Sequence, residues 1–69
     1  MNFFRKEREL RDITIEYVCE KLKYSRRTIE DLEGGKTDFL EKPYNFYCVK
    51  TYSELLGIII PKEEIEKFK

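Results

Sequence analysis

The sequence predicts an all-α fold, a compact five-helix bundle that contains a helix-turn-helix and forms one domain over residues 1–69. Apolar residues recur at i, i+3, i+4 and i+7, which is the spacing of a helix with one buried face. Residues that begin and end helices separate these runs. No stretch alternates apolar and polar residues for long enough to indicate a strand. A chain of 69 residues also lies near the lower limit for a self-sufficient core, so a single domain is expected.

The first helix is expected over residues 2–11, with Asn2 as a candidate N-cap and with Phe3 and Phe4 as apolar contacts. Thr14 stands where the N-cap of the second helix belongs, because the clearest helical repeat begins directly after it. That repeat comprises Ile15, Val18, Cys19 and Leu22. The second helix is therefore short and has one apolar face.

The third helix follows the second after a short turn. Ser25 is its expected N-cap, and Ile29 and Leu32 are its apolar anchors. The pair Gly34 and Gly35 is a strong signal for the end of this helix. Two short helices joined in this way form a helix-turn-helix.

The fourth helix is expected between Pro43 and Gly57. Proline suits the first turn of a helix because its φ angle is already set, and glycine commonly ends one. The apolar connector of residues 58–60 is expected to pack inward. Pro61 then opens a short last helix, from which Phe68 points into the core.

The fourth helix carries more apolar and aromatic surface than the core of a small domain needs. At about 100° per residue, one broad stripe comprises Tyr44, Cys48, Val49, Tyr52, Leu55 and Leu56. Phe46 and Tyr47 lie outside this stripe, at positions where a soluble helix normally carries Lys or Glu. Because a helix that is apolar on a second side usually has a second surface to cover, we expect a protein docking site here.

The composition argues against catalysis and against a metal site. The chain has no histidine, so it lacks the commonest general base and metal ligand. Its two cysteines, Cys19 and Cys48, form no C-x-x-C motif and are expected to be buried thiols in a reducing compartment. We therefore expect no catalytic residue, cofactor, metal or small-molecule substrate.

No targeting or membrane segment is expected within the chain. The N-terminal residues are charged and do not form the apolar core of a signal peptide. The longest apolar run, residues 55–61, is far too short to span a membrane. A cytoplasmic location is therefore expected.

DNA binding is the alternative function that a helix-turn-helix suggests. The residues that open the third helix, and would enter the major groove first, are Ser25, Arg26, Arg27 and Thr28. The rest of that helix is acidic, and the whole chain balances 14 basic against 14 acidic residues. DNA-binding domains of this size are usually basic, because phosphate contacts dominate their affinity. We therefore expect Arg26 and Arg27 to be solvated or paired with Glu30.

Four segments in order carry a family resemblance. They are FRKEREL, TIEYVCEKL, YSRRTIEDLEGG and the tail Y-x3-C-x3-Y-S-E-L-L-G-I-x2-P, which runs from Tyr44 to Pro61. Together they resemble the cytoplasmic helix-turn-helix domain of the RodZ family, within the lambda-repressor-like group. RodZ proteins link the actin-like filament protein MreB to the cell membrane in rod-shaped bacteria, and full-length members continue into a basic linker and a membrane span. The resemblance implies an adaptor that binds MreB in cell-shape maintenance.

The resemblance also implies which residues meet the partner, because aromatic residues on the fourth helix of RodZ contact MreB. Tyr44 matches the first of these, whereas Cys48 stands where the second usually occurs, and Tyr47 beside it is the candidate for a compensating contact. Tyr52 matches a further family aromatic, and Lys50 occupies a position that is often basic. A homodimer closed by the same aromatic face is a further alternative.

Overall fold

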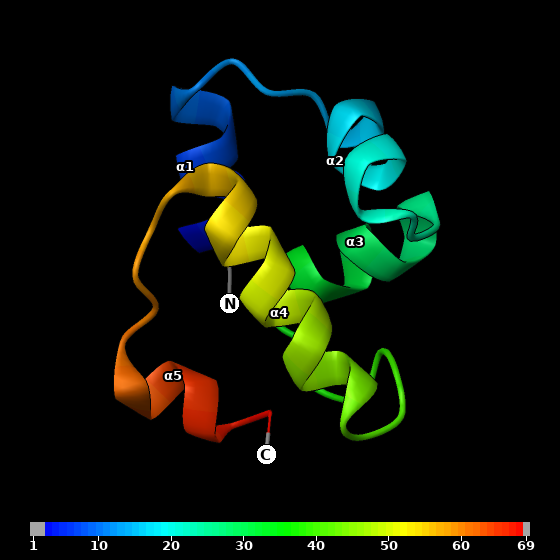
Figure 1. Cartoon of the computed structure of the whole chain (residues 1–69), viewed down its shortest axis with the longest axis vertical. Helices are drawn as coiled ribbons and strands as arrows, with labels where there is room; N and C mark the ends of the chain where they lie inside the picture. The colour runs from blue at the N-terminus through cyan, green and yellow to red at the C-terminus, as the bar shows by residue number, and fades with distance from the viewer. Residues whose placement is uncertain (1–2, 69) are drawn as a thin grey trace.

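The computed structural model of the chain describes residues 3–68, and Figure 1 shows how its helices are arranged. The helices are α1 (Phe3–Leu10), α2 (Ile15–Leu22), α3 (Arg26–Glu33), α4 (Tyr44–Leu56) and α5 (Lys62–Glu66). The described residues contain no strand, which confirms the all-α prediction. The candidate cap Asn2 lies outside the described residues.

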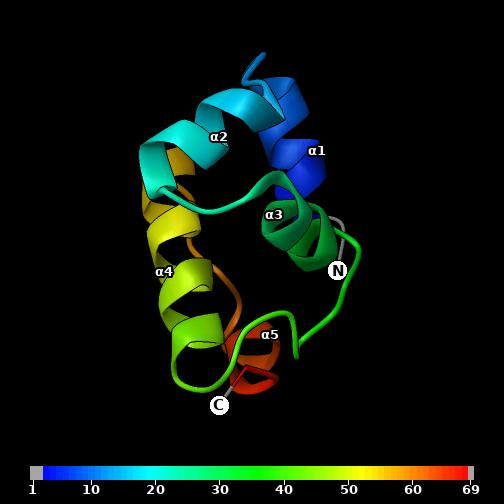
Figure 2. The same ribbon diagram turned by 90° about the vertical axis from the view of Figure 1, so that its right-hand side faces the viewer.

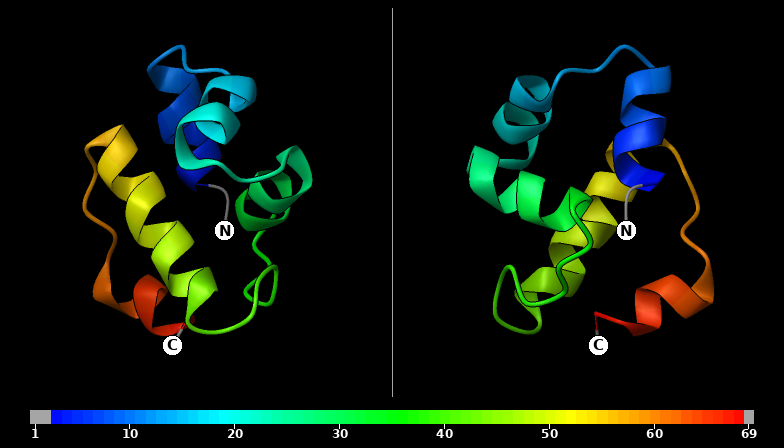
Figure 3. Two further views of the ribbon diagram at one scale, coloured as in Figure 1. Left: turned by 45° about the vertical axis from the view of Figure 1, so that its right-hand side comes forward. Right: turned by 180° about the vertical axis from the view of Figure 1, so that it is seen from behind.

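The longest helix, α4, packs against α1 and α2 and closes the core. α2 contacts both α3 and α4, and α1 likewise contacts α3 and α4. Figure 2 shows α4 on the side of the molecule opposite α3, and the views of Figure 3 place α5 at the end away from the α1–α2 connection. The core therefore lies between α4 and the helix-turn-helix made by α2 and α3. In the part of the chain that the structure describes, no helix is long and apolar enough to cross a membrane.

Side-chain caps define the two helices of the helix-turn-helix. The Thr14 hydroxyl accepts a hydrogen bond from the backbone N–H of Tyr17 at 3.1 Å, and the Ser25 hydroxyl accepts one from that of Thr28 at 3.2 Å. Both caps have the extended backbone typical of an N-cap. Lys23, in the left-handed conformation, ends α2 and turns the chain towards α3. The predicted starts of the second and third helices are confirmed.

Gly57 ends α4 in the left-handed conformation, with a φ angle of 70°. Its N–H donates to the Glu54 carbonyl at 3.1 Å, and the Ile58 N–H donates to the Ser53 carbonyl at 3.0 Å. Glycine adopts this conformation without the steric cost that a Cβ atom imposes. At the other end, Pro43 directly precedes α4. Both predicted boundaries of the fourth helix are therefore confirmed.

The hydrophobic core comprises Phe4, Ile15, Val18, Ile29, Leu32, Cys48, Val49, Tyr52, Leu56 and Phe68. The Phe4 ring stacks between two others, with its centroid 4.8 Å from that of Phe3 and 4.6 Å from that of Tyr52. Stacked aromatic pairs add about 0.5–1.5 kcal/mol to the effect of burial alone. The stack therefore fastens α1 to α4. The burial of Phe68 confirms its predicted inward position.

The connector between α4 and α5 packs inward only in part. Ile58 and Ile60 are half-buried, whereas Ile59 is 95% exposed. The prediction that the connector packs inward was therefore wrong for Ile59. The connector is not helical, and in extended backbone successive side chains point to opposite sides. Contact with the core through Ile58 and Ile60 leaves Ile59 directed into solvent.

Candidate protein-interaction surface

Tyr44 and Tyr47 form an exposed aromatic pair on the first half of α4. Their exposed fractions are 60% and 51%. Lys50, three residues beyond Tyr47, is also exposed, so the three side chains follow one another along one side of the helix. Phe46 is half-buried beside them, with its ring centroid 6.0 Å from that of Tyr47. We call Tyr44, Tyr47 and Lys50 the α4 surface.

Cys48 and Tyr52 do not belong to the α4 surface. Both side chains are completely buried. This agrees with their place in the stripe expected from the helical spacing, and it contradicts the direct partner contact that the family resemblance implied for them. The buried face of α4 comprises Asn45, Cys48, Val49, Tyr52, Ser53 and Leu56, at the spacing of a single helical face. The stripe expected from the sequence was displaced towards Tyr44, because apolar character outweighed the polar Asn45 beside it.

Asn45 holds the start of α4 in place. Its side-chain amide donates to the Thr37 carbonyl at 2.9 Å, and its side-chain oxygen accepts from the backbone N–H of Phe46 at 2.8 Å. These bonds fasten the loop before α4 to the helix and keep Tyr44 on the outer side. The sequence contains one signal for this role, since Asn45 lies three residues before the buried Cys48.

The two cysteines are free thiols. Cys48 is buried as predicted, whereas Cys19 is only half-buried. Burial raises the pKa of Cys48 to about 12, and burial also raises the pKa of Cys19. Both thiols are therefore protonated at neutral pH, and neither is an activated nucleophile. Within residues 3–68, no three or more His, Cys, Asp or Glu side chains are grouped so that they could hold a metal ion.

The two arginines predicted to contact DNA already have acidic neighbours. Arg26 donates to the Glu30 carboxylate at 3.0 Å and also pairs with Glu16 of α2. Glu30 first, and then Glu16, raise the pKa of Arg26. The pairing predicted for Arg26 is thus confirmed, whereas Arg27 lies 3.8 Å from Asp31 and has an 85% exposed side chain. Arg27 is the arginine of this helix that is open to an outside partner.

The other two predicted DNA contacts, Ser25 and Thr28, bond to each other. Their hydroxyl oxygens are 2.9 Å apart, and the Ser25 hydroxyl also caps α3. Both hydroxyls therefore make their hydrogen bonds within the first turn of α3.

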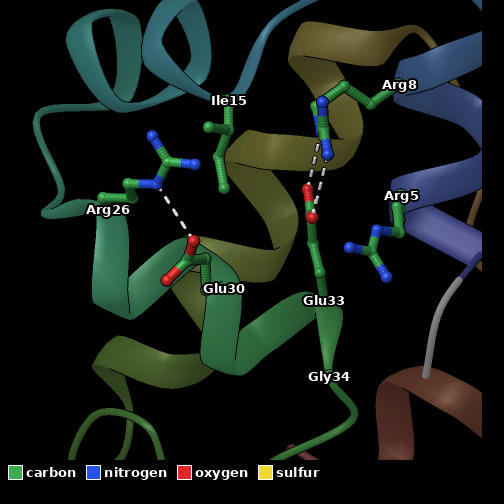
Figure 4. Close-up of a pocket in the computed structure, with 7 residues that line it drawn as sticks. All are labelled: Arg5, Arg8, Ile15, Arg26, Glu30, Glu33 and Gly34. Atoms are coloured by element: carbon green, nitrogen blue, oxygen red, sulfur yellow. Dashed lines mark hydrogen bonds and ion pairs between the residues drawn. The ribbon is translucent and has the colours of Figure 1, made fainter.

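A pocket between α1, α2 and α3 is flanked by two arginine–glutamate pairs, as Figure 4 shows. Arg26 and Glu30 form one side, Arg8 and Glu33 form the other, and Ile15 lies between the pairs. Both of these arginines already have carboxylate partners, and their ion pairs connect α1 and α2 to α3. Arg5 also lines the pocket, and its Nε lies 4.0 Å from the Glu9 carboxylate.

Arg8, Glu33 and Tyr52 form a polar network where α1, α3 and α4 meet. Arg8 donates to the Glu33 carboxylate from Nε at 2.8 Å and from Nη2 at 3.2 Å, and its Nη1 donates to the Ile13 carbonyl at 3.0 Å. The Tyr52 hydroxyl donates to the same carboxylate at 2.5 Å. Burial, followed by the bond to Glu33, raises the pKa of Tyr52, which keeps the phenol a neutral donor. The network ties α4 to α1 and α3 and so fixes how the α4 surface is presented.

Comparison with known proteins agrees with this geometry. A family model described as a helix-turn-helix domain matches residues 3–65. No match was found among curated proteins or among solved structures. The matched range covers all of α1 to α4 and most of α5. With its capped α2 and α3 joined by a short turn, the chain belongs to the helix-turn-helix domain family.

Proposed function

We propose that this domain is a non-catalytic adaptor that binds an actin-like filament protein of the MreB class through the α4 surface. The exposure of two neighbouring tyrosines, Tyr44 and Tyr47, is the observation that carries the proposal. Tyrosine is enriched at the energetic centres of protein interfaces, because its ring buries a large area at a small cost in conformational entropy. Two half-exposed rings one turn apart on a rigid helix provide such a centre.

The resemblance to RodZ supplies the class of partner. Tyr44 matches an aromatic position through which that family meets MreB, and Tyr47 takes the place of the second ring because Cys48 is buried. Lys50 adds a positive charge at the edge of the rings, where it suits an acidic rim on the partner.

Replacing Tyr44 or Tyr47 with Ala is expected to weaken co-sedimentation with MreB filaments by about 30-fold or more, which corresponds to about 2 kcal/mol for a hot-spot residue. Circular dichroism should show unchanged helicity, because both side chains are more than half exposed. The matched control is Tyr17→Ala, which removes a 43% exposed tyrosine from α2. Unchanged binding by both α4 variants, or an equal loss with Tyr17→Ala, would contradict the proposal.

DNA binding is the second candidate function, and the exposure of Arg27 at the start of α3 favours it. A helix-turn-helix places this end of its second helix in the major groove. The acidic neighbours of Arg26 oppose this function, since they would also face the phosphates.

Titration of the domain with duplex DNA at several salt concentrations separates the two candidate functions. For an adaptor we expect weak binding that Arg27→Ala does not change. A steep fall of log affinity with log salt, made shallower by about one unit in Arg27→Ala, would instead favour a DNA-binding regulator.

A further inference from the structure

A second exposed apolar surface lies on α1 and on the connector that follows α4. Leu10 is 77% exposed and Ile59 is 95% exposed. Phe3, Ile58 and Ile59 line a groove between the two segments. Grouped apolar side chains on a small domain usually mark an interaction site. This site is separate from the α4 surface, which occupies the end of α4 away from α1 (Figure 1).

Four residues of α1 face this region. At about 100° per residue, Phe3, Lys6, Glu7 and Leu10 fall within about 100° of the helix circumference. Phe3 and Glu7 line the groove with Ile59, and Lys6 and Leu10 line a second hollow on the same helix. We call these four residues and Ile59 the α1 surface.

The α1 surface is complementary to itself. Consider a second α1 lying antiparallel to the first, with a two-fold axis midway between Lys6 and Glu7. This axis places Phe3 against Leu10 of the second copy, and Lys6 against Glu7 of the second copy. Phe3 then meets Leu10, and Lys6 meets the Glu7 carboxylate, which also pairs with Arg11 of its own helix. Apolar residues and opposite charges are thus matched along α1, as a two-fold interface between identical surfaces requires.

We propose that the α1 surface binds a second copy of this chain, in a two-fold dimer with α1 packed antiparallel against α1. Leu10 of each copy enters the groove beside Phe3 of the other, and Ile59 extends the apolar contact there. α1 is only about 12 Å long, so the contact is smaller than the roughly 800 Å² per partner of a stable complex. The dimer is therefore weak, with a dissociation constant on the order of 0.1 mM, and exchanges rapidly with monomer.

Sedimentation of the chain at concentrations from roughly 10 μM to 1 mM, which bracket this constant, tests the proposal. The average mass is expected to rise towards that of a dimer. Leu10→Lys and Ile59→Lys should each weaken association by at least about tenfold, because each places a charge in the apolar contact. Tyr17→Lys, on α2, is the control and should leave the association unchanged.

A charge exchange gives the sharper test. Lys6→Glu alone and Glu7→Lys alone should each weaken association, because each sets like charges against one another across the two-fold axis. The double variant restores opposite charges and should associate to within about threefold of the original chain. Glu7 also pairs with Arg11 at 2.6 Å, so circular dichroism should accompany each variant to show that α1 stays helical.

Three results would overturn the proposal. The first is a chain that stays monomeric over the whole concentration range, which would leave the α1 surface to a different protein. The second is a double charge variant that associates no better than either single variant. The third is a dimer that is lost with Tyr47→Ala but not with Leu10→Lys, which would place the contact on the α4 surface. None of these measurements uses a filament, so their failure is independent of the proposed adaptor function.

Discussion

Replacing Glu33 with Ala is expected to lower the free energy of unfolding by about 3–5 kcal/mol. The substitution leaves the guanidinium of Arg8, whose side chain is only 12% exposed, without its carboxylate partner. It also removes the acceptor of the buried Tyr52 hydroxyl. Unpaired buried charges and donors are costly because water can no longer solvate them. Since a domain of this length has about 3–10 kcal/mol of total stability, much of the variant should be unfolded at room temperature.

Urea denaturation followed by circular dichroism measures this effect, and Glu30→Ala is the matched control. Glu30 lies in α3 like Glu33 and pairs with Arg26, but its side chain is 52% exposed. Its replacement should therefore lower the free energy of unfolding by at most about 1 kcal/mol. The triple variant Arg8→Met, Glu33→Leu and Tyr52→Phe removes the whole network and should recover most of the stability, because apolar residues of similar size replace a buried ion pair at little cost. Equal effects of Glu33→Ala and Glu30→Ala would contradict the account of the network.

The helix boundaries were predictable from the sequence because the signals that set them are local. Thr14 and Ser25 cap their helices through bonds to residues only three positions ahead. Gly57 ends α4 through its own left-handed conformation. Such interactions span one helical turn, so residue type and spacing are enough to place them.

The polar network was not predictable, because its members are far apart in the sequence. Arg8 is 25 residues from Glu33, and Tyr52 is 19 residues from it. On the sequence alone, Arg8 and Glu33 resemble the many solvated charges of a chain with 14 basic and 14 acidic residues. Only the contact of α1 with α3, together with the Tyr52 hydrogen bond from α4, shows that this pair is buried.

The candidate site was predictable only in part. Periodicity shows that α4 has one buried face, but it does not show which residues lie at the edges of that face. At about 100° per residue, the expected stripe runs around the helix from Tyr44 to Val49 and the observed buried face from Cys48 to Ser53, so the expected face is rotated by about 40°. The bond from Asn45 to the Thr37 carbonyl decides the direction, and it depends on a loop whose path the sequence does not reveal. Cys48 and Tyr52 lie within the stripe that periodicity predicts and are buried, and only the family resemblance placed them at the partner surface.

Replacing Phe4 with Ala is the second substitution for which we expect a large effect, a loss of about 3–5 kcal/mol in the free energy of unfolding. Phe4 is fully buried and is the middle ring of the stack that joins Phe3 to Tyr52. The substitution removes apolar area from the core and leaves a cavity at the contact between α1 and α4. We therefore expect α1 to detach from α4 as the domain loses stability.

Denaturant unfolding measures this loss, and amide hydrogen exchange shows where it acts. The matched control is Leu10→Ala, which shortens an apolar side chain on the same helix at a 77% exposed position and should change stability by less than about 0.5 kcal/mol. In Phe4→Ala, protection is expected to fall most in α1, because α2 and α3 keep their caps and their contacts with each other. A uniform fall in protection over all the helices would mean that α1 and the helix-turn-helix unfold as one unit. A loss of stability below about 1.5 kcal/mol would show that Phe3 or Tyr52 refills the site, and that the aromatic stack is not what joins α1 to α4.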